Sequence, residues 1–442
     1  MYVFKLLLIP LILLISLLYF NSFCSLEAAD QSIRLPIVNS NHFRVERIFS
    51  GINDSTSMAF VGPNDILILE RESGKVDRIL NGQMLDKPLI DVNAHYKDGL
   101  LGIATSEGNN GSLFVFLFFN EAPREYGMDV DNIQEADMVN RTIGYDREGD
   151  RLYRFEMVGD KLINPKLLFS IPATKPAKIL DDMHHGGEVI VGPDKAVYFV
   201  IGDLDGKYYE GGITKAQNHY NSREPDGRAG ILKLSLNGKP IGKGILGHNY
   251  PLNLYYAYGI RNSFGMDFDP VTGNLWDTEN GPDYGDEINL VKPGFNSGGD
   301  IVQGMSAGSD SLKDLVNFNG KGKYSDPQFV WTTPVGPTAI KFFDSNKFGE
   351  NYQNDIFVAD VNNGNIYHFD LNKDRTRLVL NGSLQDKVAD TPGELESIIF
   401  AKGFGGITDM EIGPDGYLYI LSYQDFLKDK YLGTLHRIVP TN

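Results

Sequence analysis

His184 and Asp203 have the residue types and the spacing that acid–base chemistry needs. His184 precedes one apolar stretch, and Asp203 follows the next one, Ala196–Ile201. If the two stretches pair as a hairpin, both side chains come to one rim, where a carboxylate can orient an imidazole and keep it basic. Residues of these types also occur in ordinary turns, so the pair by itself leaves a purely structural interpretation open.

A second group of polar residues follows downstream. Arg261–Asn262 comes first, then the turn Gly281–Pro282, and then the acidic pair Asp286–Glu287. Calcium takes oxygen ligands from carboxylates, backbone carbonyls and water, so a turn of this kind can direct successive carbonyls at one cation. An acidic loop is also typical of a solvated surface, and composition alone does not decide between the two.

The net charge of the chain limits its partners. The formal charge is −17 at pH 7, and no run of Lys and Arg interrupts it. Such a chain repels phosphate backbones, so we expect no nucleic acid partner. An acidic surface is compatible with a neutral sugar or with bound cations, although simple solubility explains most such excesses.

Short strands must position these side chains, because one module recurs along the chain. Each copy has an apolar strand, a turn of the Gly-Pro-Asp kind, a second apolar strand and a polar strand, and we count six copies, with clear ones beginning at Met58, Val189 and Met410. Strand-period alternation between tight-turn residues predicts an all-β, six-bladed β-propeller. The longer insertions Asn120–Asp150 and Leu204–Arg228 are predicted to be loops that roof a pocket on one face.

The start of the chain has the plan of an export signal. Lys5 is followed by the apolar run Leu6–Phe20 and then by small and polar residues. We expect residues 1–29 to be a signal peptide or an N-terminal membrane anchor, and residues 30–442 to be the propeller, in an extracellular or periplasmic location. The single cysteine, Cys24, lies in the leader, so removal of the leader would exclude disulfides and thiolate chemistry.

Taken in order, these pieces resemble the glucose/sorbosone dehydrogenase family, whose well-known members are soluble quinoproteins that use pyrroloquinoline quinone (PQQ) and calcium. The resemblance implies a sugar (aldose) dehydrogenase with a small-molecule sugar as substrate and an external electron acceptor as partner. It spans nearly the whole predicted propeller and rests on the segments Leu67–Gly74, Gly99–Gly102, His184–Asp203, Arg228–Lys233, Tyr256–Gly265, Gly281–Leu290, Thr333–Phe343 and Gly413–Gly416.

The resemblance also implies roles for the residues that match the family pattern. His184 would be the general base that takes the proton of the anomeric hydroxyl while hydride passes to the quinone, and Asp203 would orient it. Arg261 and Asn262 would lie on the quinone oxygens and stabilise the charge that develops there.

A metal site is implied in the same way. The carbonyls of Gly281 and Pro282 would hold the cofactor's calcium ion. Asp286 and Glu287 match the acidic pair that follows, for which the resemblance implies a structural or calcium-related role.

The chain departs from the family pattern where the carboxylates of the quinone are held. Asn362 stands where the family has a Lys, and Gly406–Asp409 stands where it has two Arg. Lys97 occupies a position that is Gln in some members. Losing three cations would remove charge-assisted hydrogen bonds of about 1.5–3 kcal/mol each, so PQQ would need replacement partners. Lys97, Lys402 and an Arg of the long loops are the candidates.

Two alternatives to the dehydrogenase remain at this point. A propeller that keeps the calcium and the pocket could bind a glycan or a protein without redox chemistry, which the missing cations favour. A calcium-dependent hydrolase of the lactonase kind is the other alternative, and it would need several side-chain oxygens converging on the propeller axis.

Overall fold

The computed structural model describes residues 35–92, 94, 99–108, 111–122, 149–172, 184–205, 212–299, 301–306, 308, 310–423 and 432–441. Ile37–Asn442 forms one compact unit, and the architecture below is that of this unit. The predicted leader, residues 1–29, lies outside the described residues. Within the described part of the chain, no helix has the length and apolar character that crossing a membrane requires.

The described strands form six sheets, numbered here in chain order. Sheet 1 contains β3 (Ser55–Gly62), β4 (Asp65–Glu70), β5 (Lys75–Leu80) and β6 (Gln83–Met84), with β7 (Ile90–Asp91) also paired to β5. Sheet 2 contains β8 (Leu100–Glu107), β9 (Leu113–Glu121), β10 (Gly149–Val158) and β11 (Lys161–Pro172). Sheet 3 contains β12 (Val189–Val191), β13 (Ala196–Ile201), β14 (Gly230–Ser235), β15 (Tyr255–Tyr258), β19 (Phe295–Asn296) and β20 (Lys323–Tyr324).

The other three sheets complete the unit. Sheet 4 contains β16 (Ser263–Phe268), β17 (Leu275–Glu279), β18 (Asp286–Val291), β21 (Phe329–Trp331) and β25 (Val388–Ala389). Sheet 5 contains β22 (Pro337–Phe342), β23 (Ile356–Asp360), β24 (Asn365–Phe369), β26 (Ile399–Lys402) and β1 (Ile37–Val38). Sheet 6 contains β27 (Gly406–Ile412), β28 (Leu418–Tyr423), β29 (Leu432–Pro440) and β2 (Phe43–Asn53).

Helical segments are few and short in the described residues. The one α-helix is α3 (Pro392–Ser397), which Thr391 begins by accepting a hydrogen bond from the amide of Glu394. The remaining helical turns are 3₁₀ segments: η3 (Lys215–Gln217), η4 (Leu252–Leu254), η5 (Asp310–Asp314) and η6 (Gly382–Asp386).

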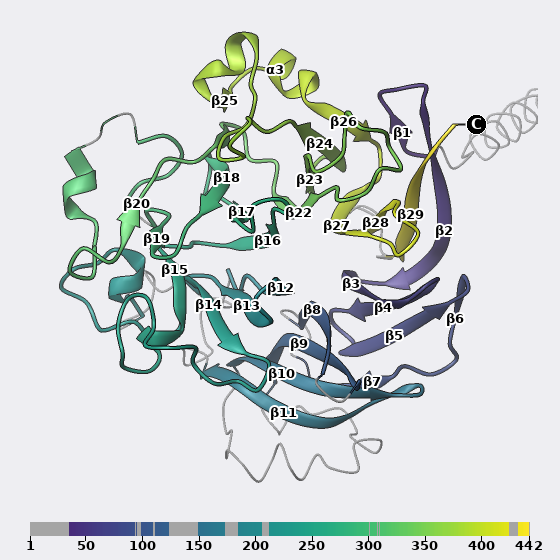
Figure 1. Ribbon diagram of the computed structural model, residues 1–442, viewed down its shortest axis with the longest axis horizontal. Coiled ribbons are helices and arrows are strands. Elements are labelled where there is room, and N and C mark those ends of the chain that lie inside the picture. The colour runs from purple at the N-terminus through teal and green to yellow at the C-terminus, as the bar shows by residue number, and fades with distance from the viewer. Residues whose placement is uncertain are drawn as a thin grey trace, which may run out of the picture. The chain divides into compact units, whose positions relative to one another are not determined.

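The sheets follow one another around a common axis (Figure 1). The inner strands β3, β8, β12, β16, β22 and β27 each contact the next, and β27 contacts β3, so the ring is closed. Strand β2 pairs antiparallel with the last strand, β29, so an early and a late segment of the compact unit lie together in sheet 6. This closed ring of mainly antiparallel sheets confirms the predicted all-β propeller.

The tight turns of the repeat are built as their residue types predict. Between β27 and β28, the amide of Gly416 donates to the carbonyl of Gly413 over 2.8 Å, and Gly416 has a φ of 79°. The carboxylate of Asp415 accepts a hydrogen bond from the amide of Tyr417. A left-handed residue at the turn is what a tight hairpin needs, and glycine adopts it without strain.

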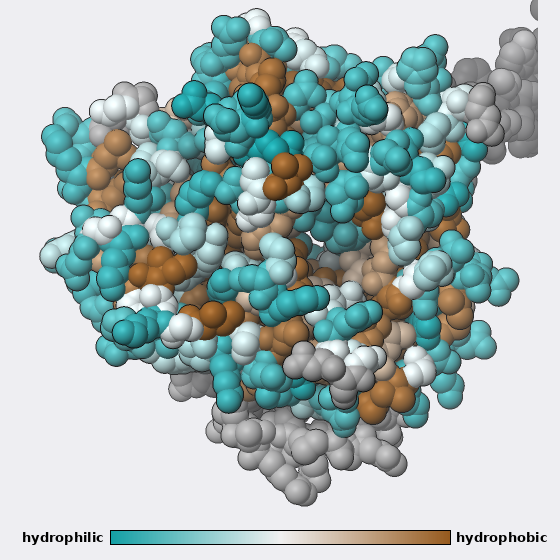
Figure 2. Space-filling view, viewed as in Figure 1, coloured by the Kyte–Doolittle hydropathy of each residue, from teal (hydrophilic) through white to brown (hydrophobic). Residues whose placement is uncertain are grey.

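The core lies between the faces of neighbouring sheets. Phe118 on β9 of sheet 2 packs against Phe199 on β13 of sheet 3, with the ring centroids 6.3 Å apart. Sheets 5 and 6 share another cluster, in which Phe357 and Ile407 are fully buried. The face shown in Figure 2 is mostly hydrophilic and is hollowed near its middle.

Candidate functional site

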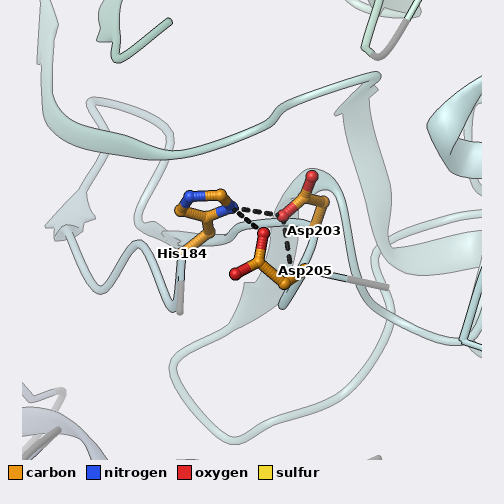
Figure 3. Close-up of side chains that lie close together, drawn as sticks. All are labelled: His184, Asp203 and Asp205. Atoms are coloured by element: carbon orange, nitrogen blue, oxygen red, sulfur yellow. Dashed lines mark hydrogen bonds and ion pairs between the residues drawn. The ribbon is translucent and has the colours of Figure 1, made fainter. Parts of the chain in front are cut away.

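The hairpin β12–β13 brings His184 and Asp203 together, as the sequence pattern predicted. Val189 on β12 pairs with Phe199 on β13, so the residues that flank the hairpin lie at one rim. Nδ1 of His184 lies 2.7 Å from Oδ1 of Asp203 (Figure 3). The side chains of both residues are buried, with 9% and 3% of their surfaces exposed.

Asp205 is a third member of this group, and sequence reasoning missed it. Its Oδ1 lies 3.2 Å from the same Nδ1 of His184, and its amide donates to Oδ1 of Asp203 over 2.9 Å (Figure 3). The available signal was the spacing Asp203–Leu204–Asp205 directly after a strand. That spacing places both carboxylates at one rim only if the backbone turns sharply after Asp203. The backbone does turn there, since Leu204 and Asp205 both have a φ of 50°.

Arg261 completes the group from the other side of the imidazole. Its Nη2 lies 2.8 Å from Nε2 of His184. A guanidinium has only donors, so Nε2 must be the acceptor and the proton of the neutral ring lies on Nδ1, where it is donated to Asp203. His184 is therefore held as the tautomer whose unprotonated nitrogen faces Arg261.

The backbone segments around the site approach one another closely. Gly202 follows β13, and a Cβ there would lie 2.0 Å from the carbonyl oxygen of His184 and 2.5 Å from that of Arg261. Only glycine permits this approach. His184 itself has a φ of 62°, a left-handed conformation that costs a non-glycine residue about 1–3 kcal/mol and is concentrated at functional sites.

Arg261 is fixed by the loop that follows β17. Its Nη1 donates to the carbonyls of Asn280 over 2.8 Å and Gly281 over 3.1 Å, and its amide donates to Glu279 over 2.7 Å. Burial raises the pKa of Glu279 to about 7, although the hydrogen bonds from Ser297 and from the Arg261 amide act in the opposite direction. The guanidinium thus bridges the histidine and the predicted calcium turn.

Asn262 supports the histidine loop rather than facing outward. It is 8% exposed, and its Oδ1 accepts a hydrogen bond from the amide of Gly186 over 3.2 Å. Its carbonyl accepts a hydrogen bond from the amide of Asn280. Asn262 therefore joins the loop that carries His184 to the loop that carries Gly281 and Pro282.

The acidic pair Asp286–Glu287 lies at the start of β18 and bonds to backbone amides. Asp286 accepts from Gly281 over 2.8 Å through Oδ1, and from Val335 and Gly336 over 2.7 and 2.8 Å through Oδ2. Burial raises the pKa of Asp286. Its carboxylate braces the turn that contains Pro282.

Glu287 is held in a similar way deeper in sheet 4. Its Oε1 accepts from the amide of Gly304 over 2.6 Å, and its Oε2 accepts from Asn289 over 3.2 Å. Burial, and then the charge of Glu279, raises the pKa of Glu287 well above its usual range.

The predicted calcium turn fits a metal only in part. Gly281 already accepts one hydrogen bond from the Arg261 guanidinium, and the oxygens of Asp286 are engaged by three amides. The turn therefore offers a cation the second lone pair of Gly281 and the carbonyl of Pro282. Calcium takes six to eight oxygens, so most of its ligands would have to come from a cofactor and from water.

The positions expected to hold the quinone carboxylates carry no cation. Nδ2 of Asn362 donates to the carbonyl of Pro334 over 3.3 Å, and Thr408 bonds to the carbonyl of Leu421. Of the candidate replacements, Lys97 lies outside the described residues, and Lys402 is paired with Glu396 over 2.6 Å. Among the described residues, the positions that the resemblance assigns to the quinone carboxylates would offer neutral side chains, so the site does not fit PQQ in full.

An all-β propeller with an Arg–His–Asp chain at one rim defines a class of protein whose site is suited to acid–base chemistry. The comparisons identify the family. The glucose/sorbosone dehydrogenase family model matches residues 52–427, and this chain belongs to that family.

Two curated relatives carry the resemblance across most of the propeller. The aldose sugar dehydrogenase YliI of Escherichia coli (strain K12) is 23% identical over 403 residues, which cover 90% of this chain and 93% of the relative. The quinoprotein glucose dehydrogenase B of Acinetobacter calcoaceticus is 27% identical over 310 residues, which cover 63% and 59% of the two chains.

Solved structures share the fold. The apo form of the soluble aldose sugar dehydrogenase from Escherichia coli superposes with a TM-score of 0.63 at 18% identity, covering 90% of this chain and all of that one. The PQQ-bound form of the aldose sugar dehydrogenase from Streptomyces coelicolor gives a TM-score of 0.60 at 19% identity, with coverage of 90% and 99%.

Proposed function

We propose that this chain is a sugar dehydrogenase that oxidises the anomeric hydroxyl of an aldose to the lactone. The observation that carries the proposal is the chain of contacts from Arg261 through His184 to Asp203. Membership of the glucose/sorbosone dehydrogenase family supports it.

His184 and the residues around it can take up the proton that this reaction releases. His184 presents an unprotonated Nε2, and a sugar hydroxyl that displaces the Arg261 N–H would be within hydrogen-bond reach of it. As His184 takes the proton, the carboxylates of Asp203 and Asp205 stabilise the imidazolium that forms. A bound two-electron acceptor would take the hydride of the anomeric carbon, and the displaced guanidinium of Arg261 would stabilise the negative charge that develops there.

For the acceptor we propose PQQ, or a related anionic quinone, bound in an altered pocket. A bound quinone would supply the two-electron acceptor, with Arg261 and Asn262 near its oxygens and a calcium ion held through Gly281 and Pro282. The PQQ-bound relative supports this assignment. The neutral Asn362 requires that the carboxylate end be held differently, and Lys97 stays a proposed partner there.

The proposal extends to the setting of the enzyme. Each of the six sheets would count as one blade, which makes the propeller six-bladed. Residues 1–29 would export the chain or anchor it, so the enzyme would act in an extracellular or periplasmic space and pass electrons to an external acceptor.

The axis of the propeller argues against a lactonase-like metal centre. Carboxylates do converge there, from Asp267 on β16 and from Asp409 and Glu411 on β27, but Lys341 on β22 lies among them, with its Nζ 2.8 Å from Glu411. An ammonium group already neutralises part of the charge that would attract a metal.

A titration tests the proposal directly. The purified chain is mixed with PQQ and calcium, and the quinone spectrum is followed while a panel of aldoses is added. Binding followed by reduction, both measured in wild type and with reduction lost in His184→Ala, is the expected result. A chain that binds no quinone at high concentration and oxidises no aldose would instead be a recognition propeller without redox chemistry.

A further inference from the structure

A cleft beside sheet 3 is not explained by the chemistry of His184. It has a volume of about 710 Å³, within the usual range for ligand sites. One wall is the loop that follows η3 and carries Tyr220, and the other is the segment Lys313–Asn317 at the end of η5. The first wall belongs to the insertion Leu204–Arg228, which the sequence predicted to roof a pocket.

The two walls of the cleft are fixed to one another. The side chains of Asn218 and Asn296 exchange two hydrogen bonds, of 2.9 and 2.7 Å. Oδ1 of Asn218 also accepts from the amide of Val316, and Asn296 donates to the carbonyl of Val316. Asn218 and Asn296 are nearly completely buried, so the cleft exists before any ligand binds.

The loop that carries Tyr220 is anchored although its tip is exposed. Thr214 and Gln217 form a capping box around η3, and both side chains are buried. Tyr220, three residues further on, is 74% exposed. An aromatic ring held out to solvent by a rigid loop loses little freedom when a ligand stacks on it.

The chemistry of the lining favours a neutral, hydroxyl-rich ligand. Besides Tyr220, the walls carry the amide groups of Asn221 and Asn317. The charged lining residues are Asp314 and Lys313, and Nζ of Lys313 is already paired with Asp310 over 2.6 Å. An anionic ligand would find no free complementary cation among these residues, whereas a pyranose ring offers a flat face for the tyrosine and hydroxyls for the amides.

A short path of hydrogen bonds runs from Asn296, the partner of the lining residue Asn218, toward the histidine. Ser297, the neighbour of Asn296, donates to Oε2 of Glu279 over 2.5 Å. The other oxygen of Glu279 accepts from the amide of Arg261, whose guanidinium contacts His184. The cleft and the candidate active site are therefore joined through one set of ordered side chains.

We propose that this cleft is a second sugar subsite, which holds a distal pyranose of a neutral oligosaccharide while the reducing end reaches His184. The inference rests on the proposed function, because it assigns the substrate class of the same site. It predicts that the enzyme prefers oligosaccharides to monosaccharides, with Tyr220 as the stacking platform.

The test uses maltotriose, cellotriose and glucose as probes. Their binding to the full chain is measured by calorimetry, and KM and kcat are measured for the oxidation of each. We expect at least one trisaccharide to bind about tenfold more tightly than glucose. Tyr220→Ala should lower the binding affinity for that trisaccharide by about two- to tenfold and raise its KM, while the KM for glucose stays unchanged.

Two matched variants control the test. Tyr220→Phe keeps the ring and should behave as wild type, and Tyr250→Ala removes another exposed tyrosine, outside the cleft, without effect. Equal affinity for glucose and both trisaccharides, or no response to Tyr220→Ala, would overturn the subsite and leave the dehydrogenase intact. Trisaccharide binding that depends on Tyr220, in a chain that oxidises no sugar, would uphold the subsite and refute the dehydrogenase.

Discussion

Arg261 donates a hydrogen bond from Nη2 to Nε2 of His184 over 2.8 Å, so a permanent cation covers the nitrogen that must act as base. The same guanidinium bonds to the carbonyls of Asn280 and Gly281. A sugar hydroxyl can reach Nε2 only by displacing Arg261, and the displaced charge is then beside the reacting centre. Arg261 thus both covers the basic nitrogen of His184 and can stabilise the negative charge that develops during the reaction.

Replacing Arg261 separates these two roles. If charge stabilisation dominates, Arg261→Met should lower kcat by about a hundredfold or more, while the KM for the sugar changes little. Arg261→Lys should recover only part of the rate, because an ammonium cannot make the forked contacts of a guanidinium. Steady-state kinetics with an artificial acceptor measures both.

Arg44→Met is the control, since Arg44 is half exposed and pairs with Glu46 away from the site. An Arg261→Met enzyme as fast as wild type would contradict the role in charge stabilisation.

The two carboxylates on Nδ1 of His184 should not be equivalent. Asp203 lies 2.7 Å from Nδ1 and Asp205 lies 3.2 Å away, so Asp203 makes the shorter bond to the tautomer that catalysis needs. Asp203→Asn should lower kcat by about a hundredfold to ten-thousandfold. Asp205→Asn should lower it by about tenfold, and the pH profiles of kcat for the two variants should differ from that of wild type.

Equal losses in the two variants would show that the imidazole shares its proton evenly between the carboxylates. Unchanged pH profiles would show that the effect of both residues is structural.

The close backbone approach at Gly202 should make this position intolerant of any side chain. In Gly202→Ala, the new Cβ would lie 2.0 Å from the carbonyl oxygen of His184, so the loops of His184 and Arg261 must separate. We expect a loss of about 2 kcal/mol in stability and a fall of more than tenfold in kcat. Urea denaturation and kinetics on the same preparation test this.

Gly393→Ala is the matched control. Gly393 lies in α3, where a Cβ would meet nothing within 4 Å, so this change should be neutral or slightly stabilising. If Gly202→Ala were as active as Gly393→Ala, the approach of the two loops would not matter for catalysis.

The sequence predicts the strands and the central pair because both depend on local patterns. The period-two alternation around Met58 and the turn at Gly413–Gly416 each specify a hairpin, and the β12–β13 hairpin places His184 beside Asp203. Asp205 escaped prediction because its position depends on two left-handed residues in a loop. The contact between Arg261 and His184 was not predicted, because it joins sheets 3 and 4. The periodicity of a sequence carries no information on contacts between sheets.

Lys341 should contribute more to the free energy of unfolding at alkaline pH than at acid pH. It is 8% exposed and lies among Asp267, Asp409 and Glu411 on the inner strands. Burial raises the pKa of Asp267 to about 6, and burial together with the charge of Glu411 raises that of Asp409 to about 7. Because Asp267 and Asp409 bind more protons in the native state than in the unfolded chain between about pH 4 and 7, their contribution to stability falls as the pH rises through that window.

Removing the ammonium group of Lys341 should leave the neighbouring carboxylates to repel one another. Lys341→Met should cost about 3–5 kcal/mol at pH 8, where the carboxylates are ionised, and clearly less at pH 5.5, where Asp267 and Asp409 take up protons. Lys402→Met is the control, because Lys402 pairs with Glu396 on the surface and should cost less than about 1 kcal/mol at either pH. Urea denaturation at the two pH values measures the difference, and a cost for Lys341→Met that is independent of pH would mean that Lys341 acts by packing rather than by charge.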